Sequence, residues 1–250
     1  MLTQCAMPVP LRGILLLTMT LGGCQNTSTT RIDAKDNTVA LPALRMAYNF
    51  DHEKQAASPH NGHAIEFGIT TARGSSSQVL SPGQLPIILN QTTFTAPQQL
   101  RNDFDFTDME LLWRYRFRNP IFNDDKLSTE ISVGAGSNTI NLKVASATQV
   151  ASRRVDSTGL RVGLGLIYRL GQSSSIQMSA LGYGSPFVIS GADQMLRYEL
   201  VYAKTYLDNF RVRAGYAIWH VKGSLSGPQA SESDFYLELS GPTLALDLEF

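Results

Sequence analysis

From His63 to the end of the chain, apolar side chains alternate with polar or small ones at a period of two residues. The clearest run, Leu160 to Leu170, has leucine, valine and tyrosine on one face and mostly arginine and glycine on the other. Successive side chains of a β-strand point to opposite faces, so this period predicts strands with two unlike faces. We count eight runs and predict an all-β fold. They lie near 65–72, 111–118, 130–136, 160–170, 176–180, 196–203, 210–218 and 244–250.

The connections between the runs alternate between long and short. The long ones comprise about 33 residues after the first run, then residues from about 137 to 158, 184–194 and 223–234. The short ones lie at 119–126, 171–174 and 208–209. Barrels of the bacterial outer membrane have short periplasmic turns and longer external loops. We therefore predict an eight-stranded antiparallel up-and-down transmembrane β-barrel, whose even strand count leaves both termini on the periplasmic side.

The polar face of these runs is rich in arginine and contains no lysine. The planar guanidinium group suits crowded, shared ion pairs, and an eight-stranded barrel is just wide enough for its own side chains to fill. An arginine in the middle of the bilayer would cost about 2 to 4 kcal/mol. We therefore predict a filled polar interior with an ion network, and an apolar face in contact with lipid. The network comprises Glu66, Arg114, Arg116, Arg118, Glu130, Arg161, Arg169, Arg197, Glu199, Arg211, Arg213, Asp247 and Glu249.

The N-terminal segment has the layout of a bacterial export signal. Arg12 precedes an apolar stretch from Ile14 to Leu21, which is shorter than the about 17 to 25 residues that span a bilayer. We therefore predict that residues 1–23 are a signal peptide that is removed. Leu21-Gly22-Gly23-Cys24 resembles the bacterial lipobox. That resemblance implies acylation of Cys24, and Gln25 after it fits onward export to the outer membrane.

Residues 24–60 are predominantly polar and predict a periplasmic linker before a barrel at 61–250. Within the linker, Leu41 to Phe50 is apolar enough for a strand or a plug, and the sequence leaves both open. The first external loop contains an apolar cluster at Leu85 to Leu89. We expect it to fold over the barrel mouth, with ligand binding as the alternative.

The C-terminal stretch GPTLALDLEF resembles the closing strand of small bacterial outer-membrane barrels. The resemblance implies that the barrel-assembly machinery reads this strand, and it places the chain in the outer membrane. Outer-membrane lipids and lipopolysaccharide are then expected partners. The residues of this assembly signal are Leu244, Leu246, Leu248 and Phe250.

No residue pattern specifies a catalytic, metal or cofactor site. His52, His60 and His63 lack a regular ligand spacing. His220, with Ser224 and Glu232, has the ingredients of an acyl hydrolase. The outer-membrane lipid A deacylases have a His-x-Ser spacing that is absent here. We prefer the interpretation that His220 and Lys222 meet lipid phosphates.

The charges, 21 basic and 21 acidic, give no electrostatic reason for a nucleic-acid partner. The only cysteines, Cys5 and Cys24, precede the predicted fold. The sequence therefore favours a structural or surface-interaction role through external loops, with a possible extracellular ligand. A lipid A-modifying acyl hydrolase, a small pore and a soluble lipocalin-like lipoprotein, whose apolar face would turn inward, are the alternatives.

Overall fold

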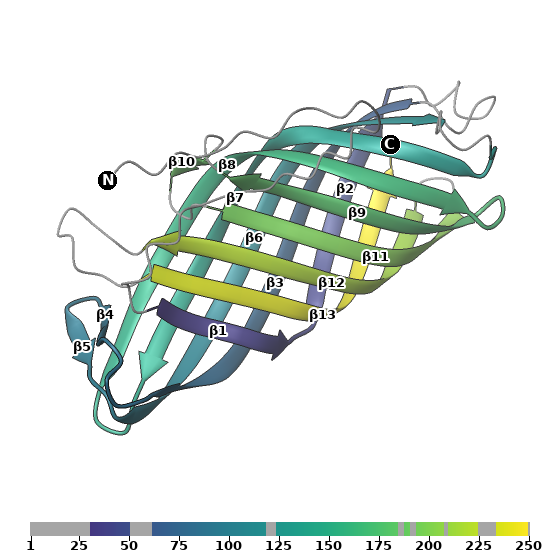
Figure 1. Cartoon of the computed structure of the whole chain (residues 1–250). Helices are drawn as coiled ribbons and strands as arrows, with labels where there is room; N and C mark the ends of the chain where they lie inside the picture. The colour runs from purple at the N-terminus through teal and green to yellow at the C-terminus, as the bar shows by residue number, and fades with distance from the viewer. Residues whose placement is uncertain are drawn as a thin grey trace, which may run out of the picture.

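The computed structural model describes residues 31–50, 62–118, 124–184, 188–190, 194–207, 210–224 and 234–249, and these are almost wholly β-strand (Figure 1). The all-β prediction is confirmed. No helix long and apolar enough to cross a membrane occurs among these residues. The strands are β1 (Arg31–Thr38), β2 (Leu41–Asn49), β3 (Gly62–Leu80), β4 (Ile87–Leu89), β5 (Thr92–Phe94), β6 (Gln98–Arg118), β7 (Leu127–Ala145), β8 (Val150–Arg169), β9 (Ser174–Gly184), β10 (Val188–Ser190), β11 (Gln194–Leu207), β12 (Phe210–Ser224) and β13 (Asp234–Glu249).

Within the described part of the chain, nine strands form a closed hydrogen-bonded ring, in the order β2-β3-β6-β7-β8-β9-β11-β12-β13. The ring closes because β13 pairs with β2. The sequence predicted a ring of eight strands, and the ring has nine instead; each of the eight predicted runs lies in one of its strands. The ninth is β2, formed by the segment that the sequence left open between a strand and a plug, in the stretch expected to be a linker.

The closing pair, β13 and β2, is parallel, whereas the other neighbours in the ring are antiparallel. An odd number of strands that alternate in direction must leave one parallel pair. The strand β1 extends this pairing along β13, from Arg31 opposite Asp234 to Thr38 opposite Ser240. The start of β1 and the end of β13 therefore lie at opposite ends of the ring (Figure 1). The even strand count predicted from the sequence would instead have placed both of them at the same end.

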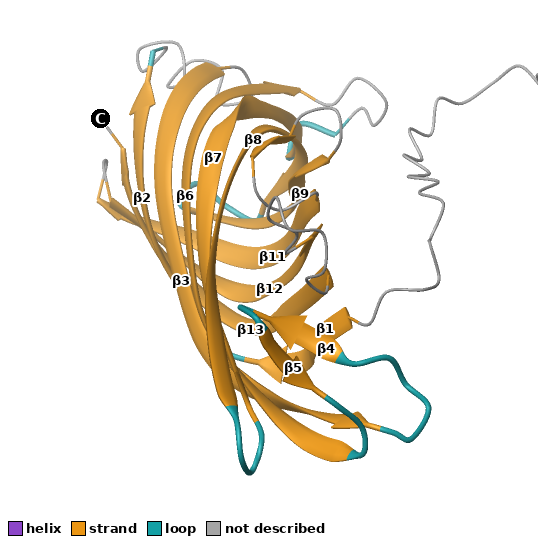
Figure 2. Ribbon diagram, turned by 90° about the vertical axis from the view of Figure 1, so that its left-hand side faces the viewer, coloured by secondary structure: helices purple, strands orange, loops and turns teal. Residues whose placement is uncertain are grey.

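Four strands, β3, β6, β7 and β8, have 19 to 21 residues and run far past the ring (Figure 2). We call their outer halves, residues 71–80, 98–107, 139–145 and 150–158, the extension. Two connections that the sequence predicted to be long loops, after the first run and at about 137–158, are therefore largely strand, and that prediction was wrong. The period of two continues in the extension, but its polarity is inverted. The apolar side chains there face inward.

An apolar core fills the interior at the extension end of the ring. Phe106 packs edge-on against Trp219, with ring centroids 5.1 Å apart. The hairpin β4-β5 closes this core with Ile87, Leu89 and Phe94, which are fully buried. Its turn, Asn90-Gln91, has positive φ at both residues, as a tight hairpin turn requires. The apolar cluster of the first long connection thus folds into the core, apart from Leu85, which stays exposed.

Candidate functional site

Large apolar side chains cover the outer face of all nine ring strands. Each is between 39% and 55% exposed. Soluble monomers rarely expose a contiguous apolar patch larger than a few hundred Å². We call this surface the apolar belt. Its members include Leu44, Met46, Ile65, Met109, Leu111, Trp113, Val133, Leu160, Val162, Leu164, Tyr168, Ile176, Met178, Tyr198, Leu200, Tyr202, Tyr216, Leu244 and Leu246.

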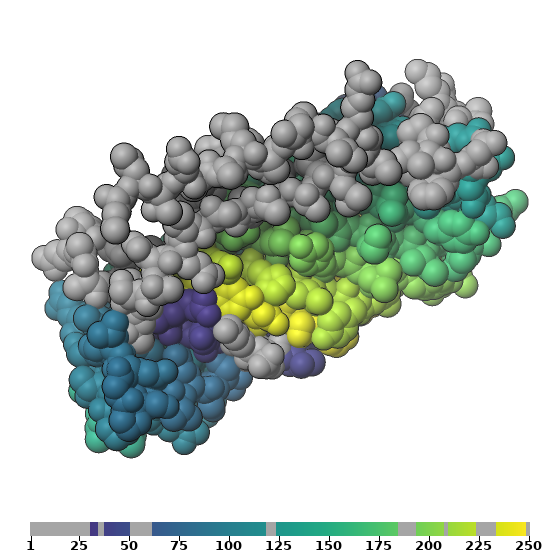
Figure 3. Space-filling model, viewed as in Figure 1, coloured from purple at the N-terminus to yellow at the C-terminus, as the bar shows by residue number. Residues whose placement is uncertain are grey.

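The belt ends abruptly where the extension begins. Thr71, Thr107 and Thr139 lie side by side in the register, and beyond them the outer face is mostly polar, with exposed Val79 and Val150 as exceptions near the strand ends. Along β8 the belt runs from Leu160 to Leu170, about 33 Å of strand. The extension (blue) projects past the ring strands (green and yellow) in the space-filling view (Figure 3). Its outward residues are Arg73, Ser75, Ser77, Gln99, Arg101, Asp103, Asp105, Asn141, Lys143, Ser152, Arg154 and Asp156.

Aromatic side chains gather on the outer face at the end of the ring opposite the extension, which we call the near end. His63 stacks on Tyr115, with ring centroids 4.6 Å apart, and Tyr115 stacks on Phe117 at 5.7 Å. Tyr48 meets Phe50 edge-on at 5.2 Å. The belt therefore has an aromatic margin at this end.

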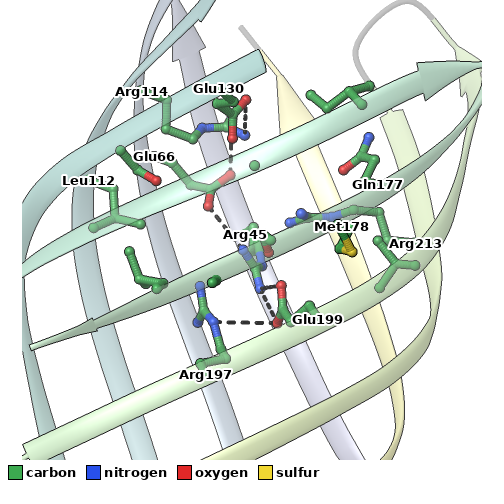
Figure 4. A pocket seen from close by; sticks show the side chains of 17 residues that line it. Arg45, Glu66, Leu112, Arg114, Glu130, Gln177, Met178, Arg197, Glu199 and Arg213 are labelled. Atoms are coloured by element: carbon green, nitrogen blue, oxygen red, sulfur yellow. Dashed lines mark hydrogen bonds and ion pairs between the residues drawn. The ribbon is translucent and has the colours of Figure 1, made fainter. Parts of the chain in front are cut away.

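The interior of the ring, at the level of the belt, is charged. Arg45 lies between two carboxylates, with Nη1 3.2 Å from Glu66 Oε1 and Nη2 2.8 Å from Glu199 Oε1 (Figure 4). Arg197 Nη1 lies 2.9 Å from Glu110 Oε1. All five side chains are buried, so each charge depends on its partners rather than on water.

Arg161 occupies the layer of this network nearest the apolar core. Its Nη1 donates to Asp108 and to Glu110, each at 2.9 Å, and its Nη2 also contacts Asp108. Arg161 has no exposed surface. Gly136 lies against the guanidinium, and a Cβ atom there would be 2.1 Å from Cζ of Arg161. The glycine thus makes room for the buried cation.

The structure brings most of the predicted ionic residues together inside the ring. Arg114 lies 3.1 Å from Glu66, and Arg116 lies 3.2 Å from Glu130. The nine that meet are Glu66, Arg114, Arg116, Glu130, Arg161, Arg197, Glu199, Arg213 and Asp247.

The other four predicted residues do not join this group. Arg118 was expected inside, but it lies at the rim, 49% exposed and paired with Asp125, because β6 ends there. Arg169 and Arg211 lie at the near end of the interior. The side chain of Glu249 is outside the described residues.

The residues of the expected assembly signal lie on the outer face of β13. Leu244 and Leu246 are in the belt, and Leu248 follows them on the same face. Phe250 is outside the described residues.

Three members of the network were missed by the sequence analysis. Arg45 lies in β2, which was expected to belong to a linker, and Asp108 and Glu110 lie in the part of β6 that was expected to be a loop. An alternation through Phe106, Asp108, Glu110 and Leu112 was the available signal. With these additions the described network contains six arginines and six acids, and it is electrically balanced.

The network leaves little open volume. A cavity among Arg45, Glu66, Arg114, Arg197 and Glu199 measures about 40 Å³. A cavity needs about 10 to 15 Å³ of such volume to hold one water molecule. The cavity therefore has room for a few water molecules.

His220 lies on the outer face of β12, just beyond the belt. Its Nδ1 is 2.7 Å from Tyr236 Oη and 3.6 Å from Glu238 Oε2. Tyr236 donates a 2.9 Å hydrogen bond to Glu238. Burial, together with the hydrogen bond to Glu238, raises the pKa of Tyr236 to about 12. Neither contact is a serine, and Glu232 and the side chain of Ser224, the other two residues of the hydrolase alternative, lie outside the described residues.

Among the described residues, no group of three or more histidine, cysteine, aspartate or glutamate side chains could hold a metal ion. The sequence analysis weighed three histidines as metal ligands. Two of them, His52 and His60, lie outside the described residues, and the third, His63, stacks on Tyr115. Comparison of the chain with protein-family models, with curated proteins and with solved structures gives no match.

Proposed function

We propose that this protein is a β-barrel of the bacterial outer membrane, with the apolar belt in lipid and the extension outside the bilayer. The observation that carries the proposal is the polarity of the ring at the level of the belt, where apolar side chains face out and ion pairs face in. A strand of about 33 Å, tilted by about 40°, spans about 25 Å, which matches the apolar band of such barrels. A closed ring also satisfies the backbone hydrogen bonds in lipid.

This polarity argues against a soluble lipocalin-like lipoprotein, which would expose its polar face. The aromatic margin at the near end of the belt is typical of side chains at a membrane surface, since rings such as those of Trp113 and Tyr115 suit the headgroup region. Outer-membrane lipids and lipopolysaccharide are therefore the partners that we propose for the belt.

We propose a structural or surface-interaction role, without catalysis, rather than conduction. Support comes from the filled interior. The ion network fills it at the level of the belt, and the apolar core, closed by the β4-β5 hairpin, fills it at the extension end. The extension offers a surface for interaction. A furrow of about 400 Å³ crosses the extension, and Arg73, Asp105, Asn141 and Lys143 are among the residues that line it. We place the interaction on this sheet, where the sequence had suggested loops.

The orientation that we propose has the C-terminal end of β13 in the periplasm and the extension at the cell surface. The strand β1 starts at the extension end. Cys24 lies seven residues before Arg31, so the two are at most about 24 Å apart along the chain. If Cys24 is acylated as the lipobox resemblance implies, its lipid would therefore enter the leaflet on the side of the extension.

The test is to express the Cys24→Ala protein and to examine detergent-extracted outer membranes. We expect a band whose migration in gel electrophoresis changes on heating, because closed barrels resist detergent until they are heated. Recovery of the protein in the soluble periplasmic fraction would overturn the proposal. In the purified protein we expect no channel conductance, and steady single-channel currents would overturn the structural role.

A further inference from the structure

The outer half of β8 is an edge of the sheet in the extension. On one side, β8 pairs with β7 from Val150 to Tyr168. On the other side, β9 pairs with it only from Val162 onward, and β10 only at 158–159. No other described strand pairs with this side of β8. Residues 150–157, about 24 Å of strand, therefore have no described strand partner there. We call them the β8 edge.

The hydrogen bonds between β7 and β8 show which backbone groups point to this edge. At the two ends of the pair, Ser146 N donates to Gln149 O at 2.8 Å, and Arg169 N donates to Lys126 O at 2.9 Å. Bonded and non-bonded pairs alternate along an antiparallel ladder, so the odd-numbered residues of β8 bond to β7. The even-numbered residues direct their N–H and C=O groups to the other side. On the β8 edge these are Val150, Ser152, Arg154 and Asp156.

The β8 edge has a polar and an apolar face. Ser152, Arg154 and Asp156 are exposed on the outer face, whereas Ala151 and Val155 are buried in the apolar core. A strand edge is a template on which another chain can pair. The short strand β10 already pairs antiparallel with this side of β8, directly beyond the edge (Figure 1). A further strand with alternating polar and apolar residues would continue both faces of the sheet.

The charges of the outer face favour an acidic partner. Three arginines of the extension each have an aspartate, in the pairs Arg73–Asp105, Arg101–Asp103 and Arg154–Asp156. Lys143 makes no ion pair within the described part of the chain, and it lies directly opposite Ser152. A carboxylate on an added strand, opposite Ser152, would be two strand spacings from Lys143, about 9.5 Å. The side chains of lysine and glutamate together can bridge that distance over the short serine.

A second copy of the chain fits this edge less well than a separate peptide segment. Two identical strands pair antiparallel about a two-fold axis perpendicular to their sheet. The extension continues the wall of the ring, so this axis would lie in the plane of the membrane (Figure 2). It would turn the second barrel upside down. A peptide segment of another protein is free of this constraint.

We propose that the β8 edge binds an extended, acidic peptide segment of a partner protein, which joins the sheet as an antiparallel strand. In strand addition, backbone hydrogen bonds supply the affinity and alternate side chains supply the specificity. The inference deepens the proposed surface-interaction role and rests on it, because a partner reaches the β8 edge only if the extension lies outside the bilayer.

The experiment measures the fluorescence anisotropy of a labelled octapeptide with the folded Cys24→Ala protein in detergent. The peptide has valine at odd positions and threonine at even positions, except for glutamate at position 6. In the proposed register, position 6 lies opposite Ser152 and position 4 opposite Arg154. We expect saturable binding with a dissociation constant below about 1 mM.

N-methylated peptides test the backbone pairing without any change to the protein. In the proposed register, the N–H groups of even-numbered peptide residues point to β8, and those of odd-numbered residues point away. A methyl group on the nitrogen of position 4 should weaken binding at least about tenfold, because it removes a hydrogen bond and obstructs the pairing. The matched control, a methyl group on the nitrogen of position 5, should leave the affinity unchanged.

A pair of charge variants tests the preference for an acidic partner. Lys143→Gln should weaken binding about two- to fivefold, as expected for an exposed ion pair. The control is Arg101→Gln, which removes an equal charge from the same face, two strands away from the edge. It should bind the peptide as the parent protein does. Equal losses in the two variants would contradict the acidic preference.

The strand addition itself is overturned by no saturable binding up to about 1 mM peptide, or by equal effects of the two methyl groups. Sedimentation of the protein alone is the remaining check. Self-association that the peptide reverses would assign the β8 edge to a second copy and contradict the inference. A heat-modifiable barrel that does not bind the peptide contradicts this inference alone. Binding by a protein recovered from the soluble periplasm contradicts the membrane proposal alone.

Discussion

At the scale of residues, the buried ion pairs specify the interior more than they stabilise it. Removal of a charge from water costs several kcal/mol, and good geometry only offsets this cost. Arg161 meets that demand with hydrogen bonds to both Asp108 and Glu110. Removal of one partner destabilises the protein strongly, because the other charges would stay buried and unpaired.

Replacement of Arg161 by methionine should therefore lower the free energy of unfolding by about 3 to 5 kcal/mol. Urea unfolding of the refolded protein, followed by tryptophan fluorescence, measures the change. The control is Arg154→Met, on the outer face of the extension, where the exposed pair with Asp156 should contribute nothing measurable. Equal effects of the two substitutions would contradict the buried network.

Gly136 offers a second test at the same scale. In Gly136→Ala the new Cβ would displace the guanidinium of Arg161, and we expect a loss of about 1 to 3 kcal/mol. Gly165→Ala is the matched control, because its Cβ would find the nearest atoms at an ordinary 3.5 Å. The same unfolding assay compares the two variants, and the prediction fails if Gly165→Ala is the more harmful.

At the scale of elements, β2 decides how the sheet closes. It pairs with β13 on one side and with β3 on the other, so that Leu44 is opposite both Leu246 and Ile69. Its sequence, LPALRMAYN, alternates over only nine residues and stands apart from the other runs. A local pattern of this length cannot reveal partners about two hundred residues away.

Cysteine cross-linking in the Cys24→Ala background tests the position of β2. We expect Leu44→Cys/Leu246→Cys to form a disulfide under mild oxidation, because the two positions are direct neighbours. Ile69→Cys/Leu246→Cys should not cross-link, since two strand spacings separate these positions by about 9.5 Å and a disulfide needs about 4.4 to 6.8 Å. The reverse result, read by a shift in gel migration, would point to a ring of eight without β2.

At the scale of the whole molecule, the protein has two zones with opposite polarity. The ring has apolar side chains outside and charges inside, whereas the extension has mostly polar side chains outside and apolar side chains inside. The change of polarity occurs within single strands, for example in β6 between Phe106 and Leu111. A boundary that crosses neighbouring strands at one level is what a membrane surface would require.

Leu164→Arg tests this boundary. Leu164 lies in the belt, so an arginine there should cost about 2 to 4 kcal/mol in a protein refolded into lipid vesicles. The control, Ser152→Arg, lies on the outer face of the extension in the same strand and should leave stability unchanged. Equal stability of the two variants would place the belt in water.

The sequence by itself determined the all-β class, the eight regular runs and which of their faces points outward, because a period of two is a local property of each strand. It also located nine of the twelve charges of the described network. The tertiary structure alone decided the parallel closure by β2 and the pairing of Arg45 and Arg161 with acids of distant strands. These depend on long-range register, which fixes the neighbours of a strand and which no local alternation encodes.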